Sequence, residues 1–201
     1  MLFKLFGNVN INVRDLKIDS LSMSGHKFYG PKGVGALYVR DGIRFNRVND
    51  GGHQEKDKRS GTENTAGIVG IGKAIDLASS EIVRYNEHLR ILSNYYLNEV
   101  SKRIPNIKIN GDVNNKLVGN NNICFAGVDG SKLLAELDKR GICASSGSAC
   151  SAGLINPSHV LLAIGVSPNL AKGSLRVTFG KENTIDDVKY LVDSLEEIIV
   201  K

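Results

Sequence analysis

The sequence predicts an α/β protein whose C-terminal part is of the α+β kind, with helices packed on a small, mostly antiparallel sheet. A long stretch, 65–103, repeats apolar residues at intervals of three and four, as an amphipathic helix does. Several short segments rich in β-branched residues are bounded by Gly and Pro, which is typical of strands. With 201 residues and 41% hydrophobic content, the chain can bury a substantial core.

The N-terminal elements are expected to be extended. Residues 9–24 alternate apolar and polar side chains in pieces, which predicts two short extended segments around a turn near Arg14. Gly30-Pro31-Lys32-Gly33 forms a tight turn that leads into a strand at 34–40. Residues 18–40 therefore read as strand, loop, strand.

The middle of the chain is expected to be one long helix followed by short strands. The helix spans 65–103 and ends before Pro105, which cannot continue it. Short strands are predicted at 107–109 and 122–126.

The last third alternates helices and strands. An amphipathic helix is predicted at 129–140, with Asp129 as N-cap and Gly141 as C-cap. A strand at 142–144 leads into a loop of small residues, 145–153. The next elements are a short helix at 157–164 with Pro in its first turn, a strand at 174–179, and a terminal helix opened by a capping box, Thr184-x-x-Asp187.

Composition favours a soluble protein in a reducing cytoplasm. The net charge is +5, but acids alternate with bases, so we expect a mixed-charge surface rather than a nucleic-acid partner. The three cysteines form no C-x-x-C pair, which argues against a disulfide framework and a zinc site. We find no signal peptide and no membrane span.

Three side chains are candidates for chemistry. Lys27 lies between an extended segment and the Gly-Pro loop, although a lone lysine is more often a surface residue. Cys150 lies in the loop of small residues, which gives a thiol room and mobility, although cysteine is also a frequent core residue. Cys124 and Cys143 fall in predicted strands, where a core position is expected. Arg176 in an apolar strand suggests a carboxylate clamp, an internal salt bridge or an outward-facing position.

A phosphate site is also suggested by local pattern. Two polar, glycine-containing segments, 51–55 and 59–62, precede the long helix. Backbone N–H groups at a helix start and the Thr62 hydroxyl can hold a phosphate.

Together these segments resemble one family, the pyridoxal-phosphate-dependent cysteine desulfurases of fold type I, in the class V aminotransferase superfamily. The matching motifs cover nearly the whole chain and are, in order, SGHKFYGPKGVGALYVR at 24–40, GGHQE at 51–55, RSGTEN at 59–64, SSGSACSAG at 145–153, PSHVL at 157–161 and SLRVTFG at 174–180. The resemblance extends to the C-terminal part of such an enzyme.

The resemblance implies a role for each candidate residue. Lys27 is the Schiff-base lysine of pyridoxal 5'-phosphate, Ser24 and His26 contact its phosphate, and Thr62 reaches the phosphate of the other subunit of a homodimer. Cys150 accepts sulfur from L-cysteine, which leaves L-alanine and an enzyme persulfide. Arg176 clamps the substrate carboxylate. The loop resembles the longer, mobile kind that delivers sulfur to scaffold or acceptor proteins for iron–sulfur cluster assembly or thiolation.

The resemblance also divides the chain. Residues 1–80 match the end of the cofactor-binding large domain with the start of a linking helix, and 81–201 match the small domain that carries the cysteine loop. The family's upstream half supplies the ring-stacking histidine, the aspartate at the pyridine nitrogen, a glutamine and a phosphate loop. Met1–Lys4 stand where that family has Asp-x-x-Gln. We therefore expect weak or no binding of the cofactor by this chain.

The sequence is compatible with three functions. The first is a desulfurase, in which a partner can supply the upstream half. The second is a catalytically inactive fragment or a binding module that retains the small domain. The third is a selenocysteine lyase or another class V relative, which shares the lysine motif, although the Ser-Gly-Ser-Ala-Cys loop argues against it.

Overall fold

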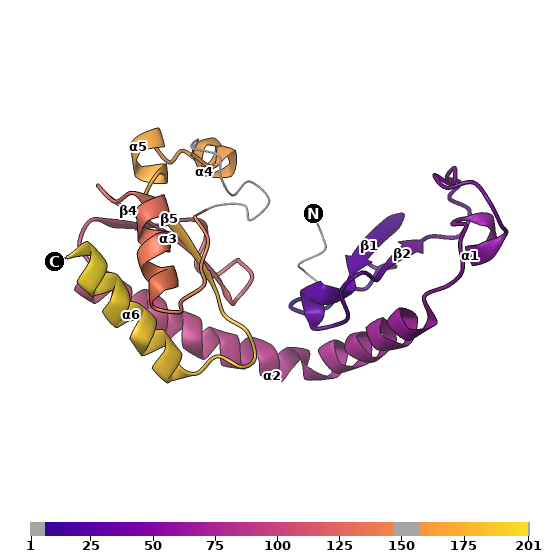
Figure 1. Ribbon diagram of the computed structural model, residues 1–201, viewed down its shortest axis with the longest axis horizontal. Helices are drawn as coiled ribbons and strands as arrows, with labels where there is room; N and C mark the ends of the chain where they lie inside the picture. Colours follow the sequence, from indigo (N-terminus) through magenta and orange to yellow (C-terminus); the bar gives the residue numbers. More distant parts are fainter. Residues whose placement is uncertain (1–6, 147–156, 201) are drawn as a thin grey trace. The chain divides into compact units, whose positions relative to one another are not determined.

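The computed structural model describes residues 7–146 and 157–200, which form two compact units (Figure 1). The first unit runs to Arg84 and the second begins at Tyr85, so the boundary falls inside one long helix. Each unit has buried residues of its own. The α/β prediction is confirmed, whereas the assignment of the two parts to a large and a small domain stays a prediction.

The first unit is built on a hairpin. Strands β1 (Ser20–Ser24) and β2 (Gly35–Val39) pair antiparallel, with Leu21 opposite Tyr38. A 3-10 turn, η2 (Gly25–Phe28), follows β1 directly. The predicted strand, loop and strand at 18–40 are confirmed.

The turn predicted near Arg14, before this hairpin, is confirmed, and the residues just ahead of it, 9–12, belong to no strand. The Asn12 side chain accepts hydrogen bonds from the backbone N–H groups of Arg14 and Asp15, at 3.0 and 3.4 Å. The backbone of Leu16 bonds back to Asn12 as well. Local bonds from a short polar side chain compete with a strand ladder, and here they favour a turn.

The core of the first unit is small. Phe28, Ile71 and Ala74 are buried, and Met23, Val34 and Ala36 pack against them. A Cβ at Gly70 would lie only 2.6 Å from the Pro31 side chain, so Pro31 of the loop packs directly on the helix backbone. A short element that the sequence did not predict, α1 (Gln54–Asp57), has positive φ at Glu55 and Lys56 and is not a regular helix.

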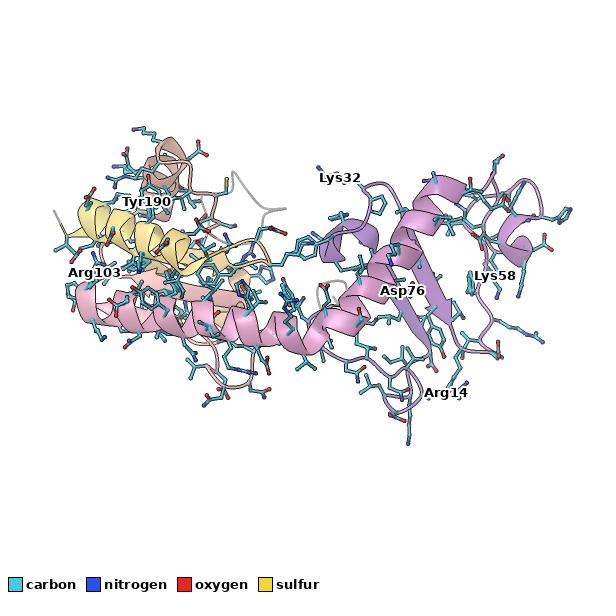
Figure 2. All side chains as sticks on the ribbon, turned by 90° about the horizontal axis from the view of Figure 1, so that it is seen from below. Arg14, Lys32, Lys58, Asp76, Arg103 and Tyr190 are labelled. Carbon is cyan, nitrogen blue, oxygen red and sulfur yellow. The ribbon has the colours of Figure 1, made fainter. Side chains whose placement is uncertain are left out.

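Helix α2 (Thr65–Arg103) confirms the predicted long helix at both ends. It begins after Asn64, whose side-chain oxygen accepts the Gly67 N–H at 3.1 Å as an N-cap does. It ends at Arg103, which is labelled in Figure 2. Arg103 forms ion pairs with Asp193 and Glu196 of the terminal helix.

The second unit holds a three-stranded antiparallel sheet in the order β3–β4–β5. Its strands are β3 (Ile107–Ile109), β4 (Asn120–Phe125) and β5 (Ser174–Thr178). Ile123 of β4 lies opposite Ile109 on one side and Leu175 on the other. The predicted antiparallel sheet is confirmed.

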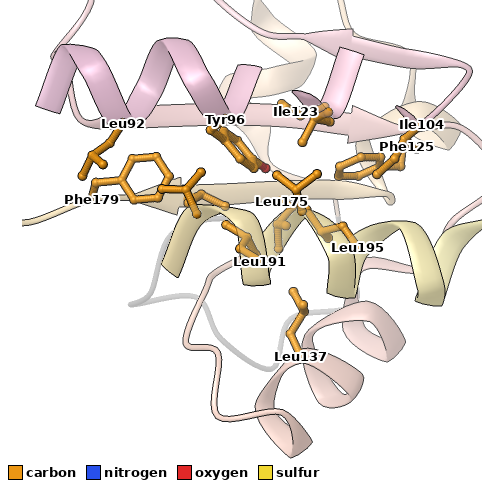
Figure 3. Packing of buried hydrophobic residues seen from close by; sticks show 14 of the residues in the cluster. Leu92, Tyr96, Ile104, Ile123, Phe125, Leu137, Leu175, Phe179, Leu191 and Leu195 are labelled. Carbon is orange, nitrogen blue, oxygen red and sulfur yellow. The ribbon is translucent and has the colours of Figure 1, made fainter. Parts of the chain in front are cut away.

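One face of this sheet carries the main core (Figure 3). Helices α2, α3 (Gly130–Lys139) and α6 (Ile185–Ile199) supply its helical side chains. Sixteen buried residues join in one cluster, and Figure 3 labels Tyr96, Ile123, Phe125, Leu175 and Leu195 among them. Burial of that many apolar side chains supports an independent fold.

The opposite face is covered by two short helices, α4 (His159–Ala163) and α5 (Pro168–Ala171). Leu161, Val166 and Ala171 pack on Cys124, which alternates with the core residues of β4. Helix α4 confirms the predicted short helix, but its N-cap is Ser158, so no proline lies in its first turn. The first-turn proline is Pro168 of α5, which the sequence did not predict.

The capping signals are confirmed. Asp129 accepts the N–H groups of Ser131 and Lys132 at the start of α3, and Gly141 has φ +73 just beyond its end. Thr184 and Asp187 form the reciprocal capping box of α6. Local polar side chains therefore fix both helix starts.

Among the helices of the described ranges, none is both long and apolar enough to cross a membrane.

Candidate functional site

The turn that carries Lys27 brings three predicted cofactor residues together. Ser24 ends β1, and its Oγ lies 3.3 Å from His26 Nδ1. His26 and Lys27 occupy η2, whose Phe28 is buried in the core of the first unit. The buried phenyl ring therefore anchors a turn whose polar side chains remain outside.

Gly25 is required because the backbone is crowded there. A Cβ at this position would lie 2.9 Å from Pro31 O and 3.2 Å from Val34 O. The Gly25 N–H bonds to Val34 O at 3.0 Å, and Gly30 N–H bonds to Gly25 O at 2.9 Å. The Gly-Pro loop thus folds back onto the turn and fixes it.

Lys27 itself is exposed, as a lone lysine most often is. In a single 3-10 turn, only one side of the helix can face the core, and Gly25 and Phe28 occupy it. Within the described residues, the Lys27 amine has no ion pair.

Thr62 lies in a loop that closes on itself before α2. The buried Ser60 hydroxyl donates to Asn49 O at 3.0 Å and Gly52 O at 2.9 Å, and the Gly61 N–H reaches Gln54 Oε1 at 3.0 Å. Thr62 is exposed at the end of this closed loop. Its hydroxyl is available, and its phosphate role stays a prediction.

Arg176 lies on β5 in the second unit, on the sheet face opposite the main core. Its neighbours Leu175 and Val177 are buried in that core, and Arg176 is half-buried. Within the described part of the chain, its guanidinium has no ion pair, so the internal salt bridge suggested by the sequence is not found there. A half-buried cation without an internal partner is suited to an external anion.

The segment that leads to Cys150 is attached beside Arg176. Ser145 pairs with Arg176 through two backbone bonds of 2.6 and 3.2 Å, and the Ser174 hydroxyl donates to Ser146 O at 2.6 Å. The strand predicted at 142–144 is wrong, because the segment pairs with β5 only through an isolated bridge at Ser145. Cys150 lies outside the described residues, as do Met1–Lys4.

The remaining cysteines differ from each other. Cys124 is fully buried in β4, as expected, but Cys143 is exposed, and its assignment to the core is wrong. Burial raises the pKa of the Cys124 thiol, while the Asn110 amide and the Lys108 charge oppose that rise. Cys124 is therefore held as a neutral thiol.

Two asparagines beside Arg176 went unrecognised in the sequence. Asn122 is the direct cross-strand neighbour of Arg176. The Asn110 Nδ2 donates to Asn122 Oδ1 at 2.6 Å and to Cys124 Sγ at 3.0 Å. A usable signal is Asn122 at the start of the strand predicted at 122–126, because asparagine is depleted in strands.

Metal chemistry has no site in the ranges that the structure describes, where no group of three or more His, Cys, Asp or Glu side chains could hold an ion.

Comparison with known proteins assigns the family. Residues 4–191 match the class-V aminotransferases. The chain belongs to this family. The resemblance predicted from the sequence motifs is confirmed.

Class-V relatives of high identity are cysteine desulfurases. The chain is 49% identical over 195 residues to the cysteine desulfurase IscS of Clostridium botulinum strain Hall, covering 96% of this chain and 49% of the relative. It is 50% identical to the cysteine desulfurase IscS of Dictyoglomus turgidum, covering 97% and 50%. The chain thus spans about half the length of the curated relatives it matches.

Solved structures have the same fold as this chain. A NifS-like protein from Rickettsia africae superposes with a TM-score of 0.88 at 31% identity, covering 100% of this chain and 52% of the other. A structure described as SspA in complex with cysteine has a TM-score of 0.67 at 32% identity, covering 90% and 50%. The described fold is therefore that of roughly half of a NifS-like protein.

Proposed function

We propose that this chain forms the lysine- and cysteine-bearing part of a pyridoxal-phosphate-dependent cysteine desulfurase. The substrate is L-cysteine and the products are L-alanine and a persulfide on Cys150. The observation that carries the proposal is the backbone pairing of Ser145 with Arg176. Ser145 begins the loop 145–153 that contains Cys150, so the start of this loop lies beside a guanidinium suited to a carboxylate. A relative solved in complex with cysteine supports the same substrate.

The residues of the Lys27 turn have the chemistry that the cofactor requires. The hydrogen-bonded Ser24 hydroxyl and His26 ring can both contact a phosphate, and the exposed Lys27 amine can bind an aldehyde. Thr62 offers a further hydroxyl for a phosphate, which in a homodimer is that of the other subunit. When bound, pyridoxal phosphate supplies an electron sink.

Each residue of the chain then has a defined task. Arg176 binds and orients the substrate carboxylate through two parallel N–H bonds. The Cys150 thiolate attacks the substrate sulfur, so the carbon–sulfur bond breaks and a sulfur–sulfur bond forms. A proton delivered to the substrate β-carbon completes alanine. The small residues of the loop let Cys150 carry the sulfur to an acceptor protein.

The test combines a spectrum with an assay. Purified chain is mixed with pyridoxal phosphate, its visible absorption is recorded, and alanine and sulfide are measured after addition of L-cysteine and a thiol reductant. Lys27→Ala should abolish the bound-cofactor band and turnover, whereas Cys150→Ser should keep the band and lose sulfide. Lys32→Ala, an exposed lysine of the adjoining loop, is the matched control and should change neither. A chain that stays colourless and inactive refutes desulfuration by this chain alone.

A second candidate is a binding module that carries sulfur without the cofactor. The large core of the second unit favours it, because that unit has the buried surface to fold without the Lys27 turn. Wild-type chain and Lys27→Ala would then accept sulfur equally from an external persulfide, as mass spectrometry of the Cys150 peptide can show. An upstream half added as a separate polypeptide distinguishes the candidates, since only the enzyme gains turnover.

The oligomeric and cellular assignments follow from the same proposal. A homodimer through the Thr62 loop and a cytoplasmic sulfur acceptor are expected for a desulfurase. Light scattering of wild type and Thr62→Ala, with and without pyridoxal phosphate, tests the dimer.

A further inference from the structure

Arg176 belongs to a row of polar side chains that crosses the sheet of the second unit. Both backbone bonds of Arg176 go to Ser145, and the Asn110 N–H bonds to Asn122 O at 2.9 Å. Asn122 and Arg176 therefore face each other as a pair without mutual backbone bonds, the arrangement in which antiparallel side chains approach most closely. Their Cβ atoms lie about 4.5–5.5 Å apart in such pairs.

The hydrogen bond from Asn110 determines which atom of the Asn122 amide, oxygen or nitrogen, can still bond to another group. One Asn110 N–H is directed to Asn122 Oδ1 and the other to Cys124 Sγ. Because the oxygen of Asn122 is used as an acceptor by Asn110, its Nδ2 is left to donate. Within the described residues, Asn122 Nδ2 has no acceptor.

The row thus places a half-buried amide donor beside a half-buried guanidinium. An arginine satisfies two carboxylate oxygens in one plane, and those oxygens keep lone pairs for a further donor. We propose that Asn122 donates from Nδ2 to the same carboxylate that Arg176 binds, and that Asn110 is the positioning residue that turns the Asn122 amide toward it. This rests on the proposed function for its substrate class, an α-amino acid carboxylate.

The experiment measures carboxylate binding without turnover. The arginine Nε–H and asparagine Nδ2–H₂ resonances of the full chain are followed by NMR during titration with L-alanine, the proposed product, and with ethylamine, which lacks the carboxylate. L-Alanine at millimolar concentrations should shift the Arg176 and Asn122 signals, and ethylamine should not. Asn122→Ala should weaken L-alanine binding about tenfold, the loss of one hydrogen bond to a charged group. Asn120→Ala, an exposed asparagine on the same strand and face, should leave binding unchanged.

The positioning role has its own variant. Asn110→Asp removes the N–H donors, so the Asn122 amide should turn its Nδ2 toward residue 110 and its oxygen toward Arg176. Binding should fall about tenfold in this variant, with little further loss when Asn122→Ala is added. Additive losses would show that Asn110→Asp acts through its charge and would overturn the positioning role.

The outcomes separate this inference from the proposed function. If Arg176→Gln abolishes binding and Asn122→Ala leaves the affinity for L-alanine unchanged, the Asn122 inference fails while the Arg176 clamp stands. If L-alanine shifts neither signal in the wild type, or Arg176→Gln has no effect, the carboxylate site itself is refuted. Where cofactor-loaded chain turns over, Asn122→Ala should raise KM for L-cysteine with kcat unchanged.

Discussion

A single methyl group at residue 173 should destabilise the sheet that carries Arg176. Gly173 precedes β5, and a Cβ there would lie 2.1 Å from Phe125 O and 2.9 Å from Val128 O. Carbon–oxygen contacts between strands are normally about 3.3 Å or more, so the Gly173 segment must move by about 1 Å. That shift would break the 3.0 Å bond from the Phe125 N–H to Gly173 O.

The magnitude follows from these two effects. Overpacking of a close contact costs about 1–3 kcal/mol, and an unsatisfied buried N–H costs a similar amount. The two costs arise from one displacement, so we expect Gly173→Ala to lower the free energy of unfolding of the second unit by about 2–4 kcal/mol. The Ser145–Arg176 pairing should loosen with it.

The assay is urea denaturation followed by the amide resonances of each unit, with Gly72→Ala as the matched control. Gly72 is exposed in α2 and a Cβ there meets nothing within 4 Å. The same chemical change should therefore raise the stability of the first unit by about 0.5–1 kcal/mol, because alanine is the better helix former. If Gly173→Ala is as stable as the wild type, the argued backbone contact is not present.

Three further perturbations probe other features. Thr184→Ala removes half of the α6 capping box and should lower the free energy of unfolding by about 1 kcal/mol. Amide hydrogen exchange should become faster only in the first turn of α6, and uniformly faster exchange across the second unit would contradict a local cap. Because burial raises the pKa of Cys124, the folded chain keeps a proton that the unfolded chain loses at alkaline pH. This contribution to the free energy of unfolding is present below the unfolded thiol pKa and is lost as pH rises through the folded pKa. Cys124→Ala should therefore reduce the fall of the urea midpoint with rising pH, and an unchanged slope would refute the linkage. Iodoacetamide followed by peptide mapping should label exposed Cys143 rapidly and Cys124 only after unfolding, and rapid labelling of both would contradict the burial of β4.

Elements governed by local signals could be predicted from the sequence. The α2 boundaries follow from a sustained apolar period and from Pro105, and both α3 and α6 follow from capping side chains within three residues of the helix start. The β1–β2 hairpin follows from apolar alternation on either side of a Gly-Pro turn. In each case the signal and the structure it specifies lie within a few residues.

The errors arise where a distant strand or an unusual backbone conformation decides the structure. The turn near Arg14 was predicted, but the hydrogen bonds to the Asn12 side chain that fix it were not. Residues near 142–144 are placed by Ser145 and Ser146 bonding to β5, which lies about 30 residues further along the chain, so strand propensity gave the wrong element and the wrong burial for Cys143. The positive φ values of Glu55 and Lys56 likewise have no signal in side-chain type.

The candidate site shows the same division. Motifs indicated Lys27, Thr62 and Arg176 as separate residues, but no sequence pattern gives the register that sets Asn122 opposite Arg176. A shift of one residue would turn Asn122 to the other face of the sheet. The placement of Asn110 and Asn122 beside Arg176 can therefore be recognised only when the pairing of β3, β4 and β5 is known.

Register also explains where the polar row of Asn110, Asn122 and Arg176 lies on the sheet. Ile123 and Phe125 of β4 point into the main core, so the intervening positions must point to the opposite face. On that face Cys124 is covered by α4 and α5, whereas Asn122, two residues earlier in the strand, is only half-buried. An apolar residue at 122 would remove the acceptor that the Asn110 amide uses beside Arg176. The Asn110–Asn122 hydrogen bond therefore accounts for a polar side chain at residue 122, beside Arg176.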